Sequence, residues 1–261
     1  MKKLVVLVAA LLVAFVLAPA TLATNGSTTD LAAPGRLISA FRGAFVAYWR
    51  SGDGVFEPGL QRVVDYWFRY HIAKGLIAAA LLVVLVVLGV LIWRAFLRAS
   101  GPRAMALATG GALATALAVL SLATVMANVQ GVAAPFGSLL PVLIGTSDGP
   151  LRGAVAEVGQ QLPQWSTRPA LEPIMSDYVR YHAAMAVEGA VVLVVLIALT
   201  VLLWRGFTRT DRAERRTRRL LASYGVLTPL LSLAVALVAV ANATTTADPL
   251  PGLEGLFAGG W

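Results

Sequence analysis

Residues 69–94 read RYHIAKGLIAAALLVVLVVLGVLIWR, and residues 180–205 read RYHAAMAVEGAVVLVVLIALTVLLWR. Both stretches open on Arg-Tyr-His and close on Trp-Arg, at a constant offset of 111 residues. Ala127-Asn128 recurs as Ala241-Asn242 at an offset of 114. Each quoted stretch is long enough to cross a bilayer core, for which roughly 20 apolar residues suffice. The pattern predicts a duplicated unit of two membrane spans, with three extra residues in the second copy.

Composition favours lipid as the surroundings of the chain. Of 261 residues, 58% are hydrophobic and only 13% are charged, whereas soluble domains carry roughly 25% charged residues. The net charge of +8 collects in two short loops between apolar runs. This distribution argues against a nucleic-acid partner and for the lipid bilayer. The chain has no cysteine, which excludes disulfides and thiolate metal sites.

The N-terminal apolar run has the layout of a secretory signal. Lys2 and Lys3 precede residues 4–18, and Thr21-Leu22-Ala23 is a candidate cleavage site. Residues 1–23 are therefore a signal peptide, which the layout favours, or an uncleaved signal anchor that forms a fifth span. The other four expected spans are residues 72–93, 104–127, 183–204 and 220–241.

We expect an all-α integral membrane protein. Its core would be a compact four-helix transmembrane bundle from two parallel two-span repeats, with extracytoplasmic helical segments. In chain order, the expected parts are the signal segment 1–23, an extracytoplasmic segment 24–56, membrane repeat 1 at 57–140, an extracytoplasmic connection 141–171, and membrane repeat 2 with its extracytoplasmic tail at 172–261.

The outer segments carry their own patterns. Residues 24–34 are rich in Ser, Thr, Gly and Ala and predict a mobile linker. Apolar residues at helical spacing in 37–49 predict an amphipathic helix, and 151–162 is its expected counterpart. Glu57-Pro58 and Glu172-Pro173 each predict a helix start, because proline is favoured in the first turn.

Loop charge predicts the orientation. The 94–103 loop carries three arginines and no acid, and the 205–219 loop carries seven arginines against two acids. The 128–182 connection has three basic and four acidic residues. By the positive-inside rule, both arginine-rich loops lie in the cytoplasm, and the long connections and C-terminus lie outside. This predicts a multi-pass protein of the cytoplasmic membrane, with parallel repeats whose matched residues lie at matched depths.

The only two histidines occupy equivalent positions in the two copies. Interfacial imidazoles serve as anchors and hydrogen-bond partners, but they can also ligate metal or haem or carry a proton. Because a complete metal site needs more ligands than two, we predict no metal and no cofactor, and expect hydrogen bonds to a nearby asparagine. The candidate polar cluster comprises His71, His182, Arg69, Arg180, Asn128 and Asn242.

Two ionisable residues, Lys74 and Glu188, lie inside expected spans. Charges in lipid are costly and usually face the bundle or a partner. Neither is duplicated, since Lys74 aligns with Met185. We predict an intramembrane ion pair between Lys74 and Glu188 across the repeat axis. The alternatives are a substrate or proton role and snorkelling to the interface.

A resemblance rests on four short motifs. These are DYWFRYH at 65–71, MANVQG at 126–131, DYVRYH at 177–182 and GGW at 259–261. Together they resemble uncharacterised multi-pass membrane proteins of high-GC actinobacteria. The resemblance covers most of residues 36–261. It implies location and architecture and supplies no catalytic residues.

No familiar catalytic motif occurs in the chain. A P-loop, a nucleophile elbow and a kinase signature are all missing, so we expect a protein that is not an enzyme. The favoured function is an envelope scaffold or interaction protein with an envelope protein partner, of open oligomeric state. One alternative is a small transporter, channel or ligand-binding carrier with a site on the repeat axis. The other is a metal- or haem-linked redox subunit using His71 and His182.

Overall fold

Long apolar runs satisfy their backbone hydrogen bonds most simply as helices, because lipid offers no partner for a free N–H or C=O group. In the computed structural model, which describes residues 1–145 and 149–259, the chain is 87% helical and has no strand. Five helices are long and apolar enough to cross a membrane. They are α1 (Lys2–Leu22), α3 (Pro58–Arg98), α4 (Gly101–Ala133), α6 (Glu172–Arg209) and α7 (Arg215–Ala247).

The two helix starts predicted from Glu-Pro are confirmed. Glu57 is the N-cap of α3, with Pro58 in its first turn, and α6 begins at Glu172. With 41 residues, α3 is about 60 Å long, at about 1.5 Å per residue. A hydrocarbon core is only about 30 Å thick. The outer end of α3 therefore extends well beyond the lipid.

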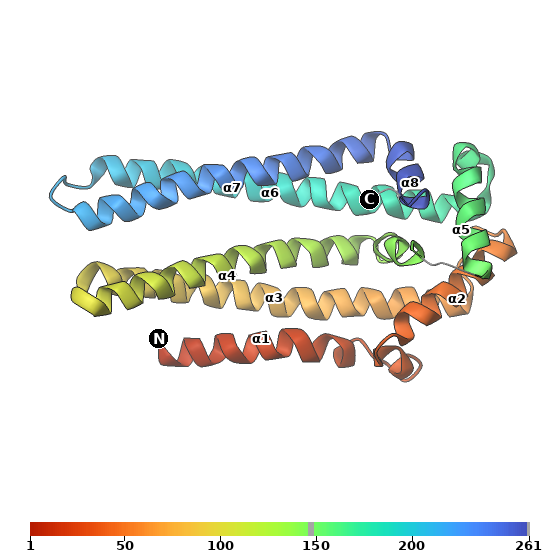
Figure 1. Cartoon of the computed structure of the whole chain (residues 1–261), viewed down its shortest axis with the longest axis horizontal. Helices are drawn as coiled ribbons and strands as arrows, with labels where there is room; N and C mark the ends of the chain where they lie inside the picture. The colour runs from red at the N-terminus through yellow and green to blue at the C-terminus, as the bar shows by residue number, and fades with distance from the viewer. Residues whose placement is uncertain (146–148, 260–261) are drawn as a thin grey trace.

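Two long hairpins make up most of the molecule, with α4 packed along α3 and α7 packed along α6 (Figure 1). Only Ala99 and Ser100 separate α3 from α4. The chain reverses there at Gly101, whose φ of +58° is readily adopted only by glycine. Helix α1 lies along α3, where Val8 is buried against Leu81 and Leu85. Figure 1 shows both hairpin loops and the N-terminus at one end of the molecule.

The opposite end of the molecule is a folded cap, which we call the collar. It combines the outer ends of α3 and α6 with six short helices that pack around them (Figure 1). These are α2 (Arg36–Ser51), η2 (Gly137–Leu143), α5 (Pro150–Gln161), η3 (Leu162–Thr167), η4 (Pro169–Leu171) and α8 (Leu250–Phe257).

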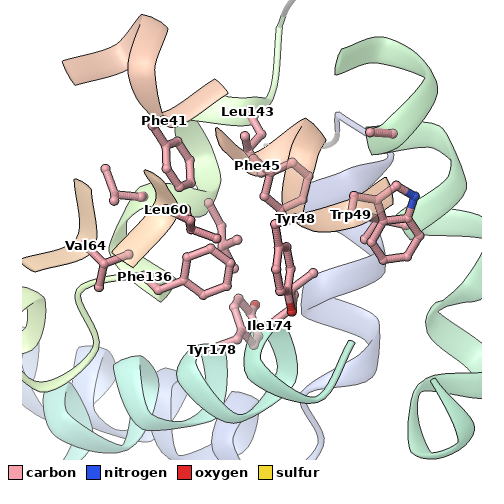
Figure 2. Packing of buried hydrophobic residues seen from close by; sticks show 14 of the residues in the cluster. Phe41, Phe45, Tyr48, Trp49, Leu60, Val64, Phe136, Leu143, Ile174 and Tyr178 are labelled. Atoms are coloured by element: carbon pink, nitrogen blue, oxygen red, sulfur yellow. The ribbon is translucent and has the colours of Figure 1, made fainter. Parts of the chain in front are cut away.

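An aromatic core holds the collar together (Figure 2). Phe41, Phe45 and Tyr48 of α2 are fully buried, and Phe136 meets Phe41 and Tyr48 edge-on with ring centroids 6.2 Å apart. Aromatic side chains bury large apolar areas, and edge-to-face contacts add a further increment. The collar is therefore a packed unit with its own core.

Both amphipathic helices predicted in the outer segments are present. Helix α2 covers residues 37–49, and α5 covers nearly all of 151–162. Their apolar faces pack into the collar core. Trp49 Nε1 in α2 donates a hydrogen bond to Glu157 Oε2 in α5 at 2.8 Å. The two helices therefore support each other directly.

The prediction of a mobile linker over residues 24–34 is wrong. This segment forms the short helix η1 (Thr29–Ala32), and Thr28 and Leu31 are buried. The Thr28 hydroxyl donates to Asn25 Oδ1 at 2.8 Å, and Arg62 forms an ion pair with Asp30 at 3.1 Å. Local side-chain hydrogen bonds of this kind fix turns in polar segments, and composition alone does not reveal them.

The helical bundle is present, but its two hairpins are not closely packed along their whole length. Near the collar, Gln130 Nε2 in α4 donates to the Tyr181 carbonyl in α6 at 3.1 Å. Towards the arginine-rich loops, a cavity of about 1050 Å³ lies between α4 and α7 and is widely open at the surface, where Met105 and Leu120 in its lining are exposed. The expected compact four-helix bundle is therefore two hairpins joined most tightly at their outer ends.

Candidate functional site

The first histidine joins the two helices of its own hairpin. His71 lies on α3, and its Nδ1 is 3.0 Å from Oδ1 of Asn128 on α4. The Asn128 amide nitrogen donates to the Thr124 carbonyl at 2.7 Å, so its Oδ1 faces His71 as the acceptor. The imidazole therefore carries its proton on Nδ1, an assignment that follows from the hydrogen-bond network.

The second histidine repeats this arrangement. Nδ1 of His182 on α6 lies 2.7 Å from Oδ1 of Asn242 on α7. The Asn242 amide nitrogen donates to the Val238 carbonyl at 2.8 Å. Each histidine thus binds the asparagine of its own hairpin, and the two pairs form separate sites.

An aromatic residue one turn earlier covers each imidazole. The Trp67 ring meets the His71 ring at 4.6 Å and 77°, and the Tyr178 ring meets the His182 ring at 4.5 Å and 65°. Trp67 also donates through Nε1 to the Ser138 hydroxyl at 2.8 Å. These contacts fix the ring planes, so the histidines are held rigidly in place.

The second ring nitrogen of His71 is buried. Its Nε2 has no hydrogen-bond partner within residues 1–145 and 149–259. A Cβ atom added to Gly131 would lie 2.5 Å from Nε2 and also 2.5 Å from Cδ2 and Cε1, so Gly131 packs against the face of the imidazole ring. Within the same residues, no group of three or more His, Cys, Asp or Glu could hold a metal ion.

The two arginines of the predicted polar cluster lie apart from the histidine–asparagine pairs. Arg69 Nε donates to the Ala23 carbonyl at the end of α1 at 2.8 Å. Arg180 forms an ion pair with Asp177 at 3.1 Å, and its side chain is 60% exposed. The expected histidine–asparagine hydrogen bonds are therefore present, whereas the two arginines of the candidate cluster make separate contacts.

The predicted ion pair between Lys74 and Glu188 is not formed. Lys74 turns towards α1, with Nζ 3.3 Å from the Tyr70 hydroxyl and 5.0 Å from the centre of the Phe15 ring. Glu188 Oε1 is buried without a partner among the described residues. The prediction paired the two charges by their depth in the membrane, whereas the rotation of α3 turns Lys74 towards the aromatic side chain of Phe15 on α1.

Asp177 connects η2 to α6, a contact that the sequence pattern did not reveal. Its Oδ2 accepts a hydrogen bond from the Gly137 backbone N–H at 2.8 Å, which ties η2 to α6. A Cβ atom on Gly137 would lie 2.7 Å from the Asp177 carbonyl oxygen, so only glycine fits there. In the repeat alignment the position of Asp177 is occupied by Tyr66, so comparing the copies hides this contact.

Tyr48 joins α2 to η4, the short helix directly before α6. Its hydroxyl donates to the Ala170 carbonyl at 2.6 Å. Burial raises the pKa of the Tyr48 phenol well above its usual value, and the carboxylate of Glu172 adds to this effect. The phenol therefore stays protonated and keeps its donor role.

A second pair of matched contacts lies near the hairpin loops. The Trp93 ring lies over Gly111, where an added Cβ atom would be 2.6 Å from the ring. The Trp204 ring lies over Gly225, with the corresponding distance 3.1 Å. Trp204 Nε1 also donates to the Gly225 carbonyl at 3.1 Å. The glycines lie 114 residues apart and the tryptophans 111. These are the offsets already found for the asparagines and the histidines, so the repeat could have predicted both contacts.

The fold and these contacts place the chain among multi-pass α-helical membrane proteins. The chain matches none of the protein-family models, curated proteins or solved structures with which it was compared. Part of the terminal GGW motif, residues 260–261, lies outside the described residues. Chemically, the two histidine–asparagine pairs act as neutral hydrogen-bonded clamps, each within one hairpin.

Proposed function

We propose that the chain is a five-span protein of the cytoplasmic membrane, with its arginine-rich loops in the cytoplasm and its collar outside. Residues 99–100 and 210–214 form the turns within the two hairpins, at the end opposite the collar, and Lys2 and Lys3 lie at that same end (Figure 1). Basic residues concentrate on the cytoplasmic side of membrane proteins. One orientation therefore accounts for all three basic segments.

We further propose that α1 is retained as the fifth span. Ala23, the last residue of the candidate cleavage site, is fully buried, and Arg69 holds its carbonyl. Tyr66 also donates through its hydroxyl to the Ala20 carbonyl at 3.1 Å. Removing residues 1–23 would take away the acceptor of Tyr66 and would leave Arg69 only its 3.4 Å contact with the Thr28 hydroxyl. The packing of α1 thus supports a signal anchor over a cleaved signal peptide.

A duplication of a two-span unit explains the matched contacts of the two hairpins. The histidine–asparagine clamp and the tryptophan–glycine contact each occur once per hairpin, at the same sequence offsets. Both hairpins run from the collar to a loop and back (Figure 1). This direction supports parallel repeats, since inverted repeats would have opposite orientations.

The function that this geometry supports best is that of a non-enzymatic envelope scaffold. The observation that carries it is a set of polar side-chain contacts that hold the elements of the collar together and tie η2 to α6. Asp177 binds Gly137, Tyr48 binds Ala170, and Trp49 binds Glu157. A rigid cap on a membrane bundle presents a fixed surface at low entropic cost, which favours binding to a partner protein.

Site-specific photo-crosslinking in cells tests this function. A photoreactive amino acid would replace Ser39, Arg152 or Ser166, which are exposed on the collar, with Leu202 on the exposed face of α6 as the control. We expect the collar positions to crosslink to one common envelope protein and Leu202 to crosslink to lipid only. Collar positions that yield no protein adduct, or the same adducts as Leu202, would contradict the scaffold.

One observation favours a second candidate function, a carrier for an apolar ligand. The cavity of about 1050 Å³ between α4 and α7 matches the upper size of ligand pockets, roughly 300–1000 Å³. Its position between the hairpins agrees with a site near the repeat axis. Transfer of a labelled apolar ligand between vesicles containing the protein would test this candidate.

The redox alternative receives less support from the geometry. Each Nδ1 is engaged by asparagine, and Nε2 of His71 is buried. An optical spectrum and metal analysis of the purified protein would test it. Stoichiometric haem or metal, lost on His71→Ala and His182→Ala, would reinstate the redox subunit.

A further inference from the structure

The cavity between the hairpins is long, apolar and lined by small side chains on one side. Alanines of α4 face leucines of α7 across it, and Phe96 of α3 contributes near the loop end. Protein interiors are normally close-packed, and alanine side chains are too short to close this gap. The cavity lining includes Ala112, Ala116, Leu220, Leu227, Arg216 and Arg219.

Tyr224 reaches across the cavity from α7 to the other hairpin. Its hydroxyl hydrogen-bonds with the Thr115 hydroxyl on α4, and its ring meets the Trp93 ring edge-on with centroids 5.9 Å apart. A large side chain therefore bridges the two hairpins in the middle of the gap. The neighbouring alanines leave space around this bridge, so the cavity is a built feature of the inner half of the bundle.

The loop end of the cavity is strongly cationic. Arg216 donates to the Ala99 carbonyl, and its guanidinium lies 6.0 Å from the centre of the Phe96 ring. Arg219 lines both the cavity and a smaller pocket of about 390 Å³, whose other charged residues are Arg212, Arg215 and Arg218. Two guanidinium groups therefore line the loop end of the apolar cavity, and three more surround the smaller pocket that shares Arg219 with it.

Arg218 of the smaller pocket is held in place by the loop itself. It donates to the Thr210 carbonyl at 2.8 Å and stacks 4.1 Å from the centre of the Phe207 ring. Its charge is therefore fixed beside Arg219 whether or not a ligand is present. The fixed positive charge gives the mouth of the cavity a permanent attraction for an anion.

We propose that the cavity binds one anionic diacyl phospholipid. Its phosphate would contact Arg216 and Arg219, and its acyl chains would occupy the space between Ala112 or Ala116 on α4 and Leu220 or Leu227 on α7. Guanidinium groups match phosphate oxygens in a bidentate geometry, and basic pockets between spans on the cytoplasmic side bind anionic head groups. The assignment to the cytoplasmic leaflet rests on the proposed topology.

Native mass spectrometry of the purified full chain tests the proposal. The probes are phosphatidylglycerol and phosphatidylcholine with identical acyl chains, titrated into the detergent-solubilised protein. We expect one tightly bound phosphatidylglycerol, and about tenfold or more weaker binding of phosphatidylcholine, since each arginine near a head group adds a favourable increment. Equal affinity for the two lipids would overturn the proposal.

Two double variants separate the site from general charge. Arg216→Gln with Arg219→Gln should weaken phosphatidylglycerol binding about tenfold or more. Arg205→Gln with Arg209→Gln removes the same charge from the same loop outside the cavity, and should change the affinity less than about twofold. Equal losses in both double variants would mean non-specific attraction and would reject the site.

A third variant tests the apolar part. Ala112→Leu with Ala116→Leu fills the cavity without changing charge, and should also abolish the tight binding. Circular dichroism verifies that each variant is folded. If the variant with the two added leucines does not fold, the opposite change is tested: Leu220→Ala with Leu227→Ala enlarges the cavity and should retain the bound lipid. The proposal fails if the filled variant keeps full affinity for phosphatidylglycerol. It also fails if the mass spectra show a lipid-free dimer, because a second copy of the protein would then occupy the cavity. Cysteine labelling of the loops tests the topology separately, so the two failures are distinguishable.

Discussion

His71 and Asn128 form a side-chain hydrogen bond that joins α3 to α4, with Nδ1 and Oδ1 3.0 Å apart. His182 and Asn242 form the same bond between α6 and α7 at 2.7 Å. Each bond stays within its own hairpin and fixes the register of two long helices near their outer ends. The paired histidines therefore work as two independent clamps, which a double-mutant analysis can resolve.

His71→Leu should destabilise the protein, because it leaves the side-chain oxygen of Asn128 without its donor. The expected cost is about 1–3 kcal/mol. Combined with Asn128→Leu, the loss should be less than additive by about 0.5–2 kcal/mol, as for other interhelical hydrogen bonds in membranes. Unfolding of the micelle-solubilised protein in increasing dodecyl sulfate measures both values. The control is the crossed pair His71→Leu with Asn242→Leu, which should be additive within about 0.5 kcal/mol; equal coupling in both cycles would show that the clamps are linked.

Gly111→Ala should be destabilising because the new Cβ atom would lie 2.6 Å from the Trp93 ring. Overpacking of this kind costs about 1–3 kcal/mol. Gly225→Ala should cost less, since its Cβ atom would lie 3.1 Å from Trp204. The adjacent Gly110→Ala is the matched control, because it meets Ile92 at an ordinary 3.9 Å and gains up to about 1 kcal/mol of helix propensity. Thermal unfolding in detergent ranks the three variants, and a different order would contradict the tryptophan contacts.

The purified protein should retain residues 1–23. Arg69 binds the Ala23 carbonyl at 2.8 Å, and Lys74 lies over the Phe15 ring at 5.0 Å. Side chains of α3 therefore contact α1 at two points along its length. Intact mass spectrometry of protein from a membrane preparation measures the N-terminus directly. A mature chain that begins at Thr24 would refute the fifth span.

Alkaline pH should loosen the collar through Tyr48. Its pKa is raised in the folded protein by burial and by Glu172, so the folded state keeps a proton that the unfolded state releases above about pH 10. The stabilising contribution is complete below that pH, and it is lost at up to about 1.4 kcal/mol per pH unit as the pH rises further. Unfolding free energies at about pH 8 and about pH 11 should therefore differ less in Tyr48→Phe than in the natural protein. Phe45→Leu is the control, and its destabilisation should be the same at both pH values.

Single cysteines should report the orientation without interference, because the chain has none of its own. An impermeant thiol reagent should label Ser166→Cys and Ala258→Cys in intact cells. Ser100→Cys, in the loop between α3 and α4, should react only after permeabilisation. Labelling at position 100 in intact cells, together with protection at position 166, would invert the proposed topology.

Sequence reasoning located the helices well because their signals are local. Apolar length alone predicts a membrane span, and Glu57-Pro58 marked the start of α3 to the residue. Side-chain partners were harder to predict, because they depend on the rotation of one helix against another. Lys74 was assigned to Glu188 by depth in the membrane, although its real neighbours, Tyr70 and Phe15, lie on α3 itself and on α1.

The order of amino acids is enough to locate the membrane-length helices, the loops that carry the positive charge, and the residues that recur at fixed offsets. These are properties of short stretches and of their repetition. The packed structure was needed to show that each histidine binds the asparagine of its own hairpin, that Asp177 ties η2 to α6, and that a cavity with an arginine rim lies between α4 and α7. The reason is physical: these contacts depend on helix rotation and on the gap left between small side chains, and both are set by the packing of all the helices together.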